Sequence, residues 1–246
     1  TADTQSPEVN YTIILDEKSL RQWIKRLSKA GIFSLDTETT SLDTLCAELV
    51  GISFTDHAGE GAYLPLAHDY VGAPLQVSLK DALTCLRPLL EDSKIGKIGQ
   101  NLKYDRSVLQ NYGIDLKGIR FDTMLESYVL NSTGSRHDMN TLALKYLGYQ
   151  VVKYEEVAGS GKSQVSFSQV DVERAGHYAA EDADIAMRLH EKIYPQLQLE
   201  PALCSVLETI EIPLVSVLSR VERNGVRVDC DMLSNHSIEL GERIAQ

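Results

Sequence analysis

FSLDTET (Phe33–Thr39) is the stretch of sequence that decides the fold, because it joins an apolar strand to two acidic side chains. Its apolar residues favour a strand, and Gly31 supplies the preceding turn. Successive strand side chains point to opposite faces, so Asp36 and Glu38 emerge on one face, about 7 Å apart along the backbone. Carboxylates at a buried strand end repel each other and lose hydration, and a divalent cation offsets both costs. Hard oxygen ligands favour Mg²⁺ or Mn²⁺, whereas the alternative is an exposed loop with two solvated acids.

Composition limits the domain organisation and the classes of partner. The chain has 246 residues, of which 43% are hydrophobic and 24% charged, as in an ordinary globular protein. This length fits one large domain, or one of about 190 residues followed by a fragment. The net charge of −11 argues against a protein that grips duplex DNA over its whole surface. A nuclease remains compatible with it, because a cation site gathers acids and a single-stranded end needs few phosphate contacts.

Targeting signals and cysteine usage indicate a cytoplasmic protein. No signal peptide is visible, and the apolar runs look too short to span a bilayer. The cysteines are scattered, which fits reduced thiols better than a disulfide framework or a zinc site. They are Cys46, Cys85, Cys204 and Cys230. Residues 1–9 are polar, and we expect a linker remnant there.

Hydrophobic periodicity and turn signals predict an α/β domain. The expected strands are Tyr11–Leu15, the Asp36 stretch, Leu49–Phe54, Ala62–Leu66 and Lys94–Gly99. The second, third and fourth of these are joined by tight turns and suggest an antiparallel meander. The expected helices are one capped by Asp16 or Ser19, one capped by Ser78, one after Asn101, Phe121–Asn131, Asp138–Leu147 and Asp171–Leu197. Together they predict a mixed sheet of about five strands flanked by helices.

Two further stretches could complete a metal site. Asn101 is expected to cap a helix, which places Asp105 one turn into it, although an acid near a helix N-terminus is common. Tyr178 and Asp182 are four residues apart on a predicted helix and share one face. An acid on an otherwise apolar helical face is costly unless something pairs with it.

These motifs carry a resemblance to a known family. Asp36-x-Glu38, Asn101-x-x-x-Asp105 and Tyr178-x-x-x-Asp182, in this order, resemble the three motifs of the DEDD superfamily of 3′→5′ exonucleases. Residues from about 10 to 246 resemble the bacterial DNA polymerase I family, specifically its proofreading domain at the start of the Klenow fragment. The resemblance implies a ribonuclease H-like fold in residues 10–198. Residues 199–246 would begin the polymerase domain, leading into its thumb and lacking the nucleotide-transfer site.

The resemblance also implies a chemistry for individual residues. Asp36, Glu38, Asp105 and Asp182 would bind two divalent cations, Mg²⁺ or Mn²⁺, with Zn²⁺ as an alternative at one site. Glu38 and Tyr178 would orient the attacking water. The residues expected to hold the terminal nucleotides are Thr39, Leu42, Gln100, Asn101, Tyr104, Met124, Arg136 and Tyr154. The implied reaction removes nucleoside monophosphates from single-stranded or frayed 3′ ends of DNA, in a monomer continuous with the rest of the polymerase.

Three alternatives remain open at this point. Ribonuclease D-type enzymes share the acidic motifs but degrade RNA, and a catalytically silent domain would keep only the fold. In one DEDD branch a histidine replaces the tyrosine, and this chain has both His177 and Tyr178. Helix geometry favours the tyrosine, since it lies roughly 40° from Asp182 and the histidine roughly 140° away.

Overall fold

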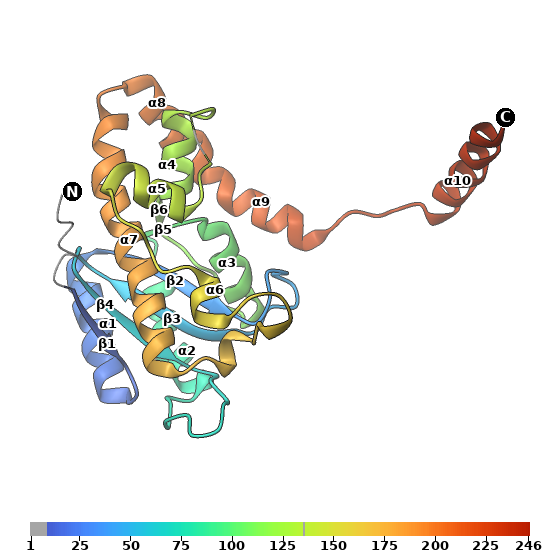
Figure 1. Ribbon diagram of the computed structural model, residues 1–246. Coiled ribbons are helices and arrows are strands. Elements are labelled where there is room, and N and C mark those ends of the chain that lie inside the picture. The colour runs from blue at the N-terminus through green and yellow to red at the C-terminus, as the bar shows by residue number, and fades with distance from the viewer. Residues whose placement is uncertain (1–8, 135) are drawn as a thin grey trace, which may run out of the picture.

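The computed structural model describes residues 9–134 and 136–246 and has a six-stranded sheet with helices on both faces (Figure 1). The expected linker remnant lies outside the described residues except for Val9. The strands are β1 (Asn10–Ile13), β2 (Ile32–Thr39), β3 (Leu49–Thr55), β4 (Glu60–Pro65), β5 (Gly96–Gly99) and β6 (Ile119–Asp122). The helices are α1 (Glu17–Ala30), α2 (Leu79–Leu90), α3 (Leu102–Asn111), α4 (Thr123–Leu130), α5 (Met139–Leu142), α6 (Tyr154–Ala158), α7 (Val172–Gln198), α8 (Pro201–Val206), α9 (Ile212–Asn224) and α10 (Cys230–Ala245).

The sheet is mixed, as the sequence predicts. Its strand order is β1-β4-β3-β2-β5-β6. The β2, β3 and β4 strands form the expected antiparallel meander, while β5 and β6 continue the sheet in parallel with β2. The β1 strand pairs in parallel with β4 at the other edge. The β2 strand pairs with β5 over Ile32–Ser34 and with β3 over Ser34–Thr39, so the hydrogen bonds to β3 fix the directions of Asp36 and Glu38.

One strand was assigned wrongly from the sequence. Phe121 was expected to begin a helix, but it lies in β6, and the helix begins only at Thr123. The strand has four residues, too few for a period to show. Asp122 ends it and caps α4 by accepting hydrogen bonds from the backbone N–H groups of Met124 and Leu125.

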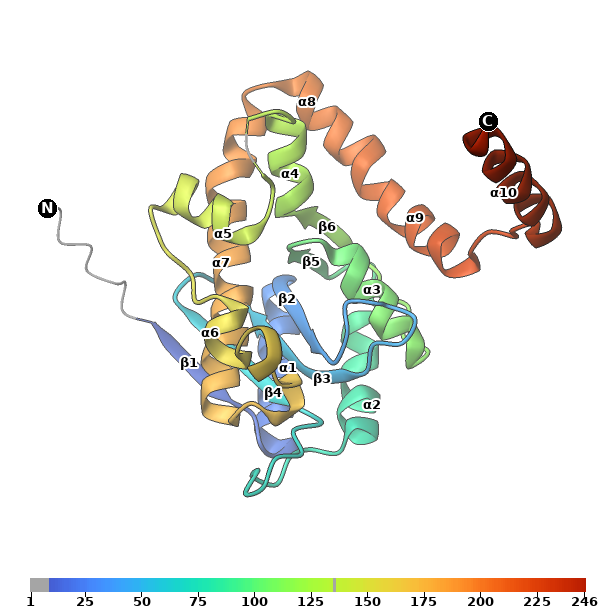
Figure 2. The ribbon, with the colours of Figure 1, turned by 45° about the vertical axis from the view of Figure 1, so that its right-hand side comes forward.

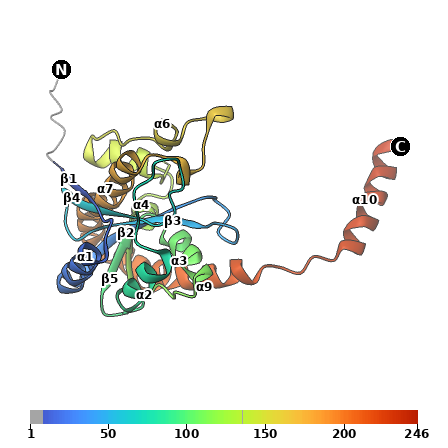
Figure 3. The same ribbon diagram turned by 90° about the horizontal axis from the view of Figure 1, so that it is seen from below.

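Different helices cover the two faces of the sheet, as the view in Figure 3 shows. The long helix α7 packs across β1 to β5 on one face, where its alanines let it approach closely. The opposite face is covered by α1, α2 and α3, whose leucines pack on Phe33, Leu35 and Phe54. Side chains alternate along β2, so these apolar residues face one layer while Asp36 and Glu38 face α7.

The helix starts predicted from capping residues are confirmed where a side chain performs the cap. Asp16 accepts from the N–H of Ser19 and begins α1, and Ser78 begins α2 in the same way. Asp171 begins α7, and Asp138 begins α5, which continues as a π-helical turn over Ala143–Leu147. Asn101 is the N-cap residue of α3 and Asp105 lies in its first turn, as predicted, but the Asn101 side chain makes no capping hydrogen bond.

After α7 the chain runs through a second helical stretch. In the described residues, Pro201–Asn224 is long and apolar enough to cross a membrane by length and composition alone, contrary to our expectation from the sequence. This stretch packs against α3: Ser219 and Ser107 share a hydrogen bond of 3.0 Å, and Glu222 pairs with Lys103 at 2.5 Å. The last helix, α10, has no buried residue and extends away from the rest of the chain (Figures 1 and 3).

Candidate active site

A cavity of about 670 Å³ opens where β2 ends. Figure 2 shows this end of β2 between α3 on one side and α6 and α7 on the other. The lining comes from β2 and the turn after it, the start of α3, the segment around α6, and α7. All the site residues expected from the sequence line it except Met124 and Arg136.

Three carboxylates form the centre of this cavity. Asp36 and Glu38 come from β2 and Asp182 from α7, and one carboxylate oxygen of each lies within 4.8 Å of the others. The strand's two-residue period directs the first two acids towards the face that α7 covers. The cluster therefore follows from local strand geometry together with the packing of a single helix.

Asp105 reaches the same cavity from the other face of the sheet. It lies in the first turn of α3, is 2% exposed, and is held by Thr37. The backbone N–H and the hydroxyl of Thr37 donate to its Oδ1 at 2.9 and 2.7 Å. Because Thr37 points away from Asp36 and Glu38, Asp105 lines the cavity without joining the 4.8 Å cluster.

Burial and mutual repulsion strongly favour the protonated form of these acids. Desolvation is the largest cause, and it raises the pKa of Asp182 to about 8 and that of Asp105 to about 7. Desolvation and the neighbouring carboxylates raise the pKa values of Asp36 and Glu38 well above their usual range. The ionised cluster is therefore unstable by itself.

The donor set fits a hard divalent cation. Glu38 Oε1 is buried and has no hydrogen-bond partner among the described residues, although buried polar atoms are normally paired. The cavity is lined by carboxylate, hydroxyl and amide oxygens, and no cysteine or histidine of the described chain lines it. Such ligands select Mg²⁺ or Mn²⁺ over softer ions.

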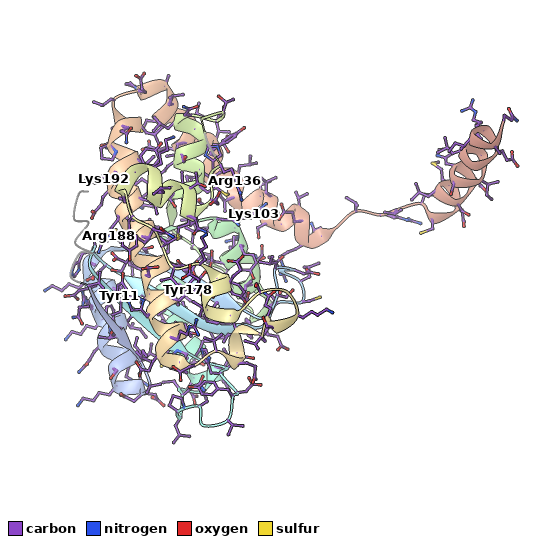
Figure 4. The ribbon with its side chains drawn as sticks, in the orientation of Figure 1. Tyr11, Lys103, Arg136, Tyr178, Arg188 and Lys192 are labelled. Atoms are coloured by element: carbon purple, nitrogen blue, oxygen red, sulfur yellow. The ribbon has the colours of Figure 1, made fainter. Side chains whose placement is uncertain are left out.

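Tyr178 and His177 lie in different environments. Tyr178 lines the cavity, and burial followed by the charge of Asp182 raises the pKa of its hydroxyl, which keeps it neutral. His177 is exposed and packs edge-to-face on the ring of Tyr11, with centroids 5.2 Å apart. Figure 4 shows Tyr178 on the stretch of α7 beside α6. The structure thus brings the tyrosine and not the histidine to the carboxylates.

The turn after β2 carries a projecting leucine. Leu42 is 92% exposed and lines the mouth of the cavity. The turn below it is fixed by the Ser41 carbonyl, which accepts from the hydroxyls of Tyr104 at 2.6 Å and Thr39 at 3.1 Å. The hydroxyls of Tyr104 and Thr39 also lie within hydrogen-bond distance of each other, so either can donate to the other instead of to the Ser41 carbonyl. An apolar side chain held on such a fixed turn can pack against a base.

An aromatic cluster forms the wall opposite that turn. Tyr154 stacks on Phe167 with ring centroids 6.1 Å apart, and both pack against Tyr178. Glu155 and Gln164 line the cavity, and Phe167 supports Tyr154 and Tyr178; none of the three was predicted from the sequence. They lie in a segment without a steady period, so only the tertiary structure reveals them.

Met124 and Arg136 stand apart from the cavity lining. Met124 is half-buried in the first turn of α4. The side chain of Arg136 is 85% exposed and pairs with Asp138 at 3.1 Å, and Figure 4 shows it nearer to α4 than to Tyr178. Both residues were expected, from the family resemblance, to contact a bound DNA strand. Those contacts stay predictions.

Comparison with known proteins identifies the family. The sequence model of a family described as 3′–5′ exonuclease matches residues 11–198. The chain belongs to this 3′–5′ exonuclease family. It is 50% identical over 239 residues to DNA polymerase I of Pseudomonas aeruginosa, covering 96% of this chain and 26% of the polymerase. It is 44% identical to DNA polymerase I of Rhizobium leguminosarum over 253 residues, covering 96% of this chain and 25% of that one.

The exonuclease chain is thus homologous over nearly its whole length to bacterial DNA polymerase I, and it spans about a quarter of those relatives. Among solved structures, it resembles the POL domain of Pol1 from M. smegmatis, with a TM-score of 0.75 and 19% identity over 95% of this chain and 35% of that one. It also resembles Escherichia coli RNase D, with a TM-score of 0.65 and 20% identity over 87% and 51%. These likenesses confirm the ribonuclease H-like exonuclease fold.

The raised pKa values predict that the folding stability of the metal-free chain falls as the pH rises. Acids with a raised pKa bind protons in the folded chain at pH values where the unfolded chain has lost them. The stability that these protons contribute is complete below about pH 4 and is lost towards pH 8. Each such acid lowers the free energy of unfolding by up to about 1.4 kcal/mol per pH unit in this range. In EDTA the melting temperature should therefore fall between pH 5 and pH 8, and Mg²⁺ should restore it.

A matched pair of variants tests the origin of this effect by thermal melting. Asp182→Asn should flatten the pH profile in EDTA and raise the melting temperature at pH 8, because one repelling charge is removed. Glu242→Gln, at an exposed position of α10, should follow the parent profile. A metal-free profile that rises with pH for the parent would contradict the repulsion among the cavity acids.

Proposed function

We propose that the chain is the proofreading domain of a DNA polymerase I and removes nucleoside monophosphates from 3′ ends of DNA. The observation that carries this proposal is the three-carboxylate cluster of Asp36, Glu38 and Asp182, with Asp105 beside it. Phosphodiester hydrolysis asks a protein mainly for positioning and charge stabilisation, which a cation site provides. The 50% identity to a DNA polymerase I supports DNA as the substrate.

The carboxylates would hold two divalent cations. Asp36, Glu38 and Asp182 form one candidate ligand set, and Asp105 with Asp36 would complete a second. When bound, such ions lower the pKa of a water and stabilise the charge on a leaving oxygen. A relative of the same fold, Brucella melitensis NrnC with bound Mg²⁺, has a TM-score of 0.58 and 15% identity over 90% of this chain and 97% of that one. Zn²⁺ in one of the two cation sites is the alternative that the family resemblance implies.

The chain's own residues would orient the water and the strand. The Tyr178 hydroxyl stays neutral, so it can donate a hydrogen bond while Glu38 accepts one from the same water. Leu42 would pack against the terminal base, and Tyr104 and Thr39 would hold the turn that presents it. Tyr154 offers a ring from the opposite wall. A single-stranded or frayed 3′ end fits such a site because its bases are free to leave the stack.

The polymerase assignment extends to the rest of the chain. Residues 10–198 would form the nuclease domain, and residues 199–246 would begin the polymerase domain. The match to the exonuclease family ends at residue 198, which supports this boundary. Apolar side chains on α10 are exposed, including Leu233, Ile238 and Ile244, and would pack on the remainder of the polymerase. We expect a monomer located in the bacterial cytoplasm, associated with the nucleoid.

Two other functions compete with this proposal. An RNase D-like exoribonuclease is favoured by the similarity of fold to Escherichia coli RNase D. A silent structural domain would not need to keep carboxylates in a costly buried cluster, whereas all four are present here.

Digestion of 3′-labelled single-stranded DNA and RNA, with Mg²⁺ or with EDTA, separates these functions. The parent should shorten DNA, require Mg²⁺, and act on RNA much more slowly. Asp36→Ala and Asp182→Ala should remove most of this activity while the fold and its melting transition are retained, because each removes a cation ligand. Near-normal Mg²⁺-dependent hydrolysis by either variant would rule out the proposed cation site.

A pair of substitutions distinguishes Tyr178 from His177. Tyr178→Phe should slow single-turnover hydrolysis by about 10-fold or more, the scale of a lost positioning hydrogen bond. The ring would still pack on Phe167. His177→Ala should stay within about 3-fold of the parent rate, because a contact on an exposed surface is worth little. The opposite order of effects would assign the role to the histidine.

A further inference from the structure

The turn between β5 and α3 has a backbone conformation that needs an explanation. Asn101 has φ 64° and ψ 47°, the only positive φ of a non-glycine residue among residues 9–134 and 136–246. The left-handed region is disfavoured for residues with a side chain, although asparagine tolerates it best. Gln100 and Asn101 both line the cavity. A disfavoured conformation at such a site persists only when surrounding contacts enforce it.

The contact that enforces it comes from Asp122. This carboxylate is 1% exposed, and its oxygens accept from the backbone N–H groups of Asn101 at 3.0 Å and Leu102 at 2.8 Å. An asparagine at a helix start normally accepts, with its side chain, from an N–H group two or three residues further on, here Lys103 or Tyr104. The Asn101 side chain makes no such hydrogen bond within the described residues, and Asp122 instead binds the backbone N–H groups of Asn101 and Leu102 at the turn itself.

The same aspartate also begins the next helix. Its Oδ1 accepts from the N–H groups of Met124 at 3.1 Å and Leu125 at 3.4 Å, at the start of α4. One buried carboxylate therefore serves two helix N-termini, where a negative charge is favoured. The β6 strand delivers it by pairing with β5, whose last residue, Gly99, lies opposite Asp122.

The side-chain amide of the neighbouring residue, Gln100, is held by other contacts. The Thr123 hydroxyl donates to Gln100 Oε1 and lies 3.2 Å from the Gly99 carbonyl oxygen. Gln100 Nε2 donates to the His137 carbonyl at 2.7 Å. Both ends of the Gln100 amide are thus engaged within the protein, and the Asn101 amide is the one left available to the cavity.

We propose that Asp122 is a positioning residue for the 3′-terminal nucleotide: by accepting from the backbone N–H groups of Asn101 and Leu102 it holds the left-handed turn, and this turn presents the Asn101 amide to the strand. This inference rests on the proposed nuclease function for the identity of the ligand. The capping itself is a property of the fold and can be tested without catalysis. The alternative is that Asp122 only joins α3 to α4 and has no influence on binding.

The test compares Asp122→Ser with the parent. Serine at this position can still cap α4, since it is a favoured N-cap residue, but it is too short to serve Asn101 and Leu102 as well. Hydrogen exchange should show faster exchange at the Asn101 and Leu102 amides, while amides later in α3 keep their protection. With 3′-labelled single-stranded DNA, KM should rise about 5-fold or more and kcat should change less than about 3-fold, because ground-state binding is lost.

A double-mutant cycle separates positioning from simple stability. Asn101→Gly accepts the left-handed conformation and removes the amide. In that background Asp122→Ser should raise KM no further, because the group that it positions is already absent. Asp16→Ala removes the cap of α1, which does not line the cavity, and should lower the melting temperature without changing KM. Asp122→Thr, which can also cap α4 but is too short to reach Asn101, replaces the serine variant if the latter does not fold.

Each outcome decides the question. An unchanged KM in the Asp122 variants, or KM effects that add fully to those of Asn101→Gly, would reduce Asp122 to a structural role and overturn the proposal. Unchanged exchange at the Asn101 and Leu102 amides would also overturn it. A parent protein with no Mg²⁺-dependent nuclease activity would instead contradict the proposed function, and the exchange result would still report whether Asp122 caps α3.

Discussion

Repulsion among four carboxylates at the end of β2 is the constraint on which the arrangement of this site depends. Burial raises the pKa values of all four, and neighbouring negative charges add to this effect at Asp36 and Glu38. A chain keeps such a cluster only if the remaining structure tolerates its cost. Here the pairing of β2 with β3 along its acidic end, and the packing of α7 across five strands, hold the acids in place. A bound cation then reduces the electrostatic free energy of carboxylates that the fold already holds together.

The two faces of the sheet contribute different parts of the site. The α7 face brings Asp182 and Tyr178 to Asp36 and Glu38, while the α3 face brings Asp105, which Thr37 holds. The end of a strand is the place where side chains of both layers can meet, because the sheet no longer separates them. The turn from β5 to α3 adds the amides, and the cap by Asp122 links their placement to the edge of the sheet.

Local periodicity was enough to predict the parts of the site that lie within one element. The two-residue period put Asp36 beside Glu38, and the four-residue spacing put Tyr178 beside Asp182; the structure has both pairs in the cavity. The meander and the long helix were predicted for the same reason. The β6 strand and the role of Asp122 were missed, since a four-residue strand shows no period and a cap given to another helix leaves no local pattern. Gln164 was missed because it reaches the cavity from an irregular segment.

The most direct test of the central claim is calorimetric titration of the metal-free chain with Mn²⁺ at pH 7, in two buffers of different ionisation enthalpy. Binding should be saturable and should release protons, because ligation needs the ionised form of carboxylates whose pKa values lie near or above this pH. Asp36→Asn should weaken binding severely, while Glu242→Gln should match the parent. Absence of Mn²⁺ binding, or binding with no proton release, would contradict the account of a desolvated carboxylate cluster built for a cation.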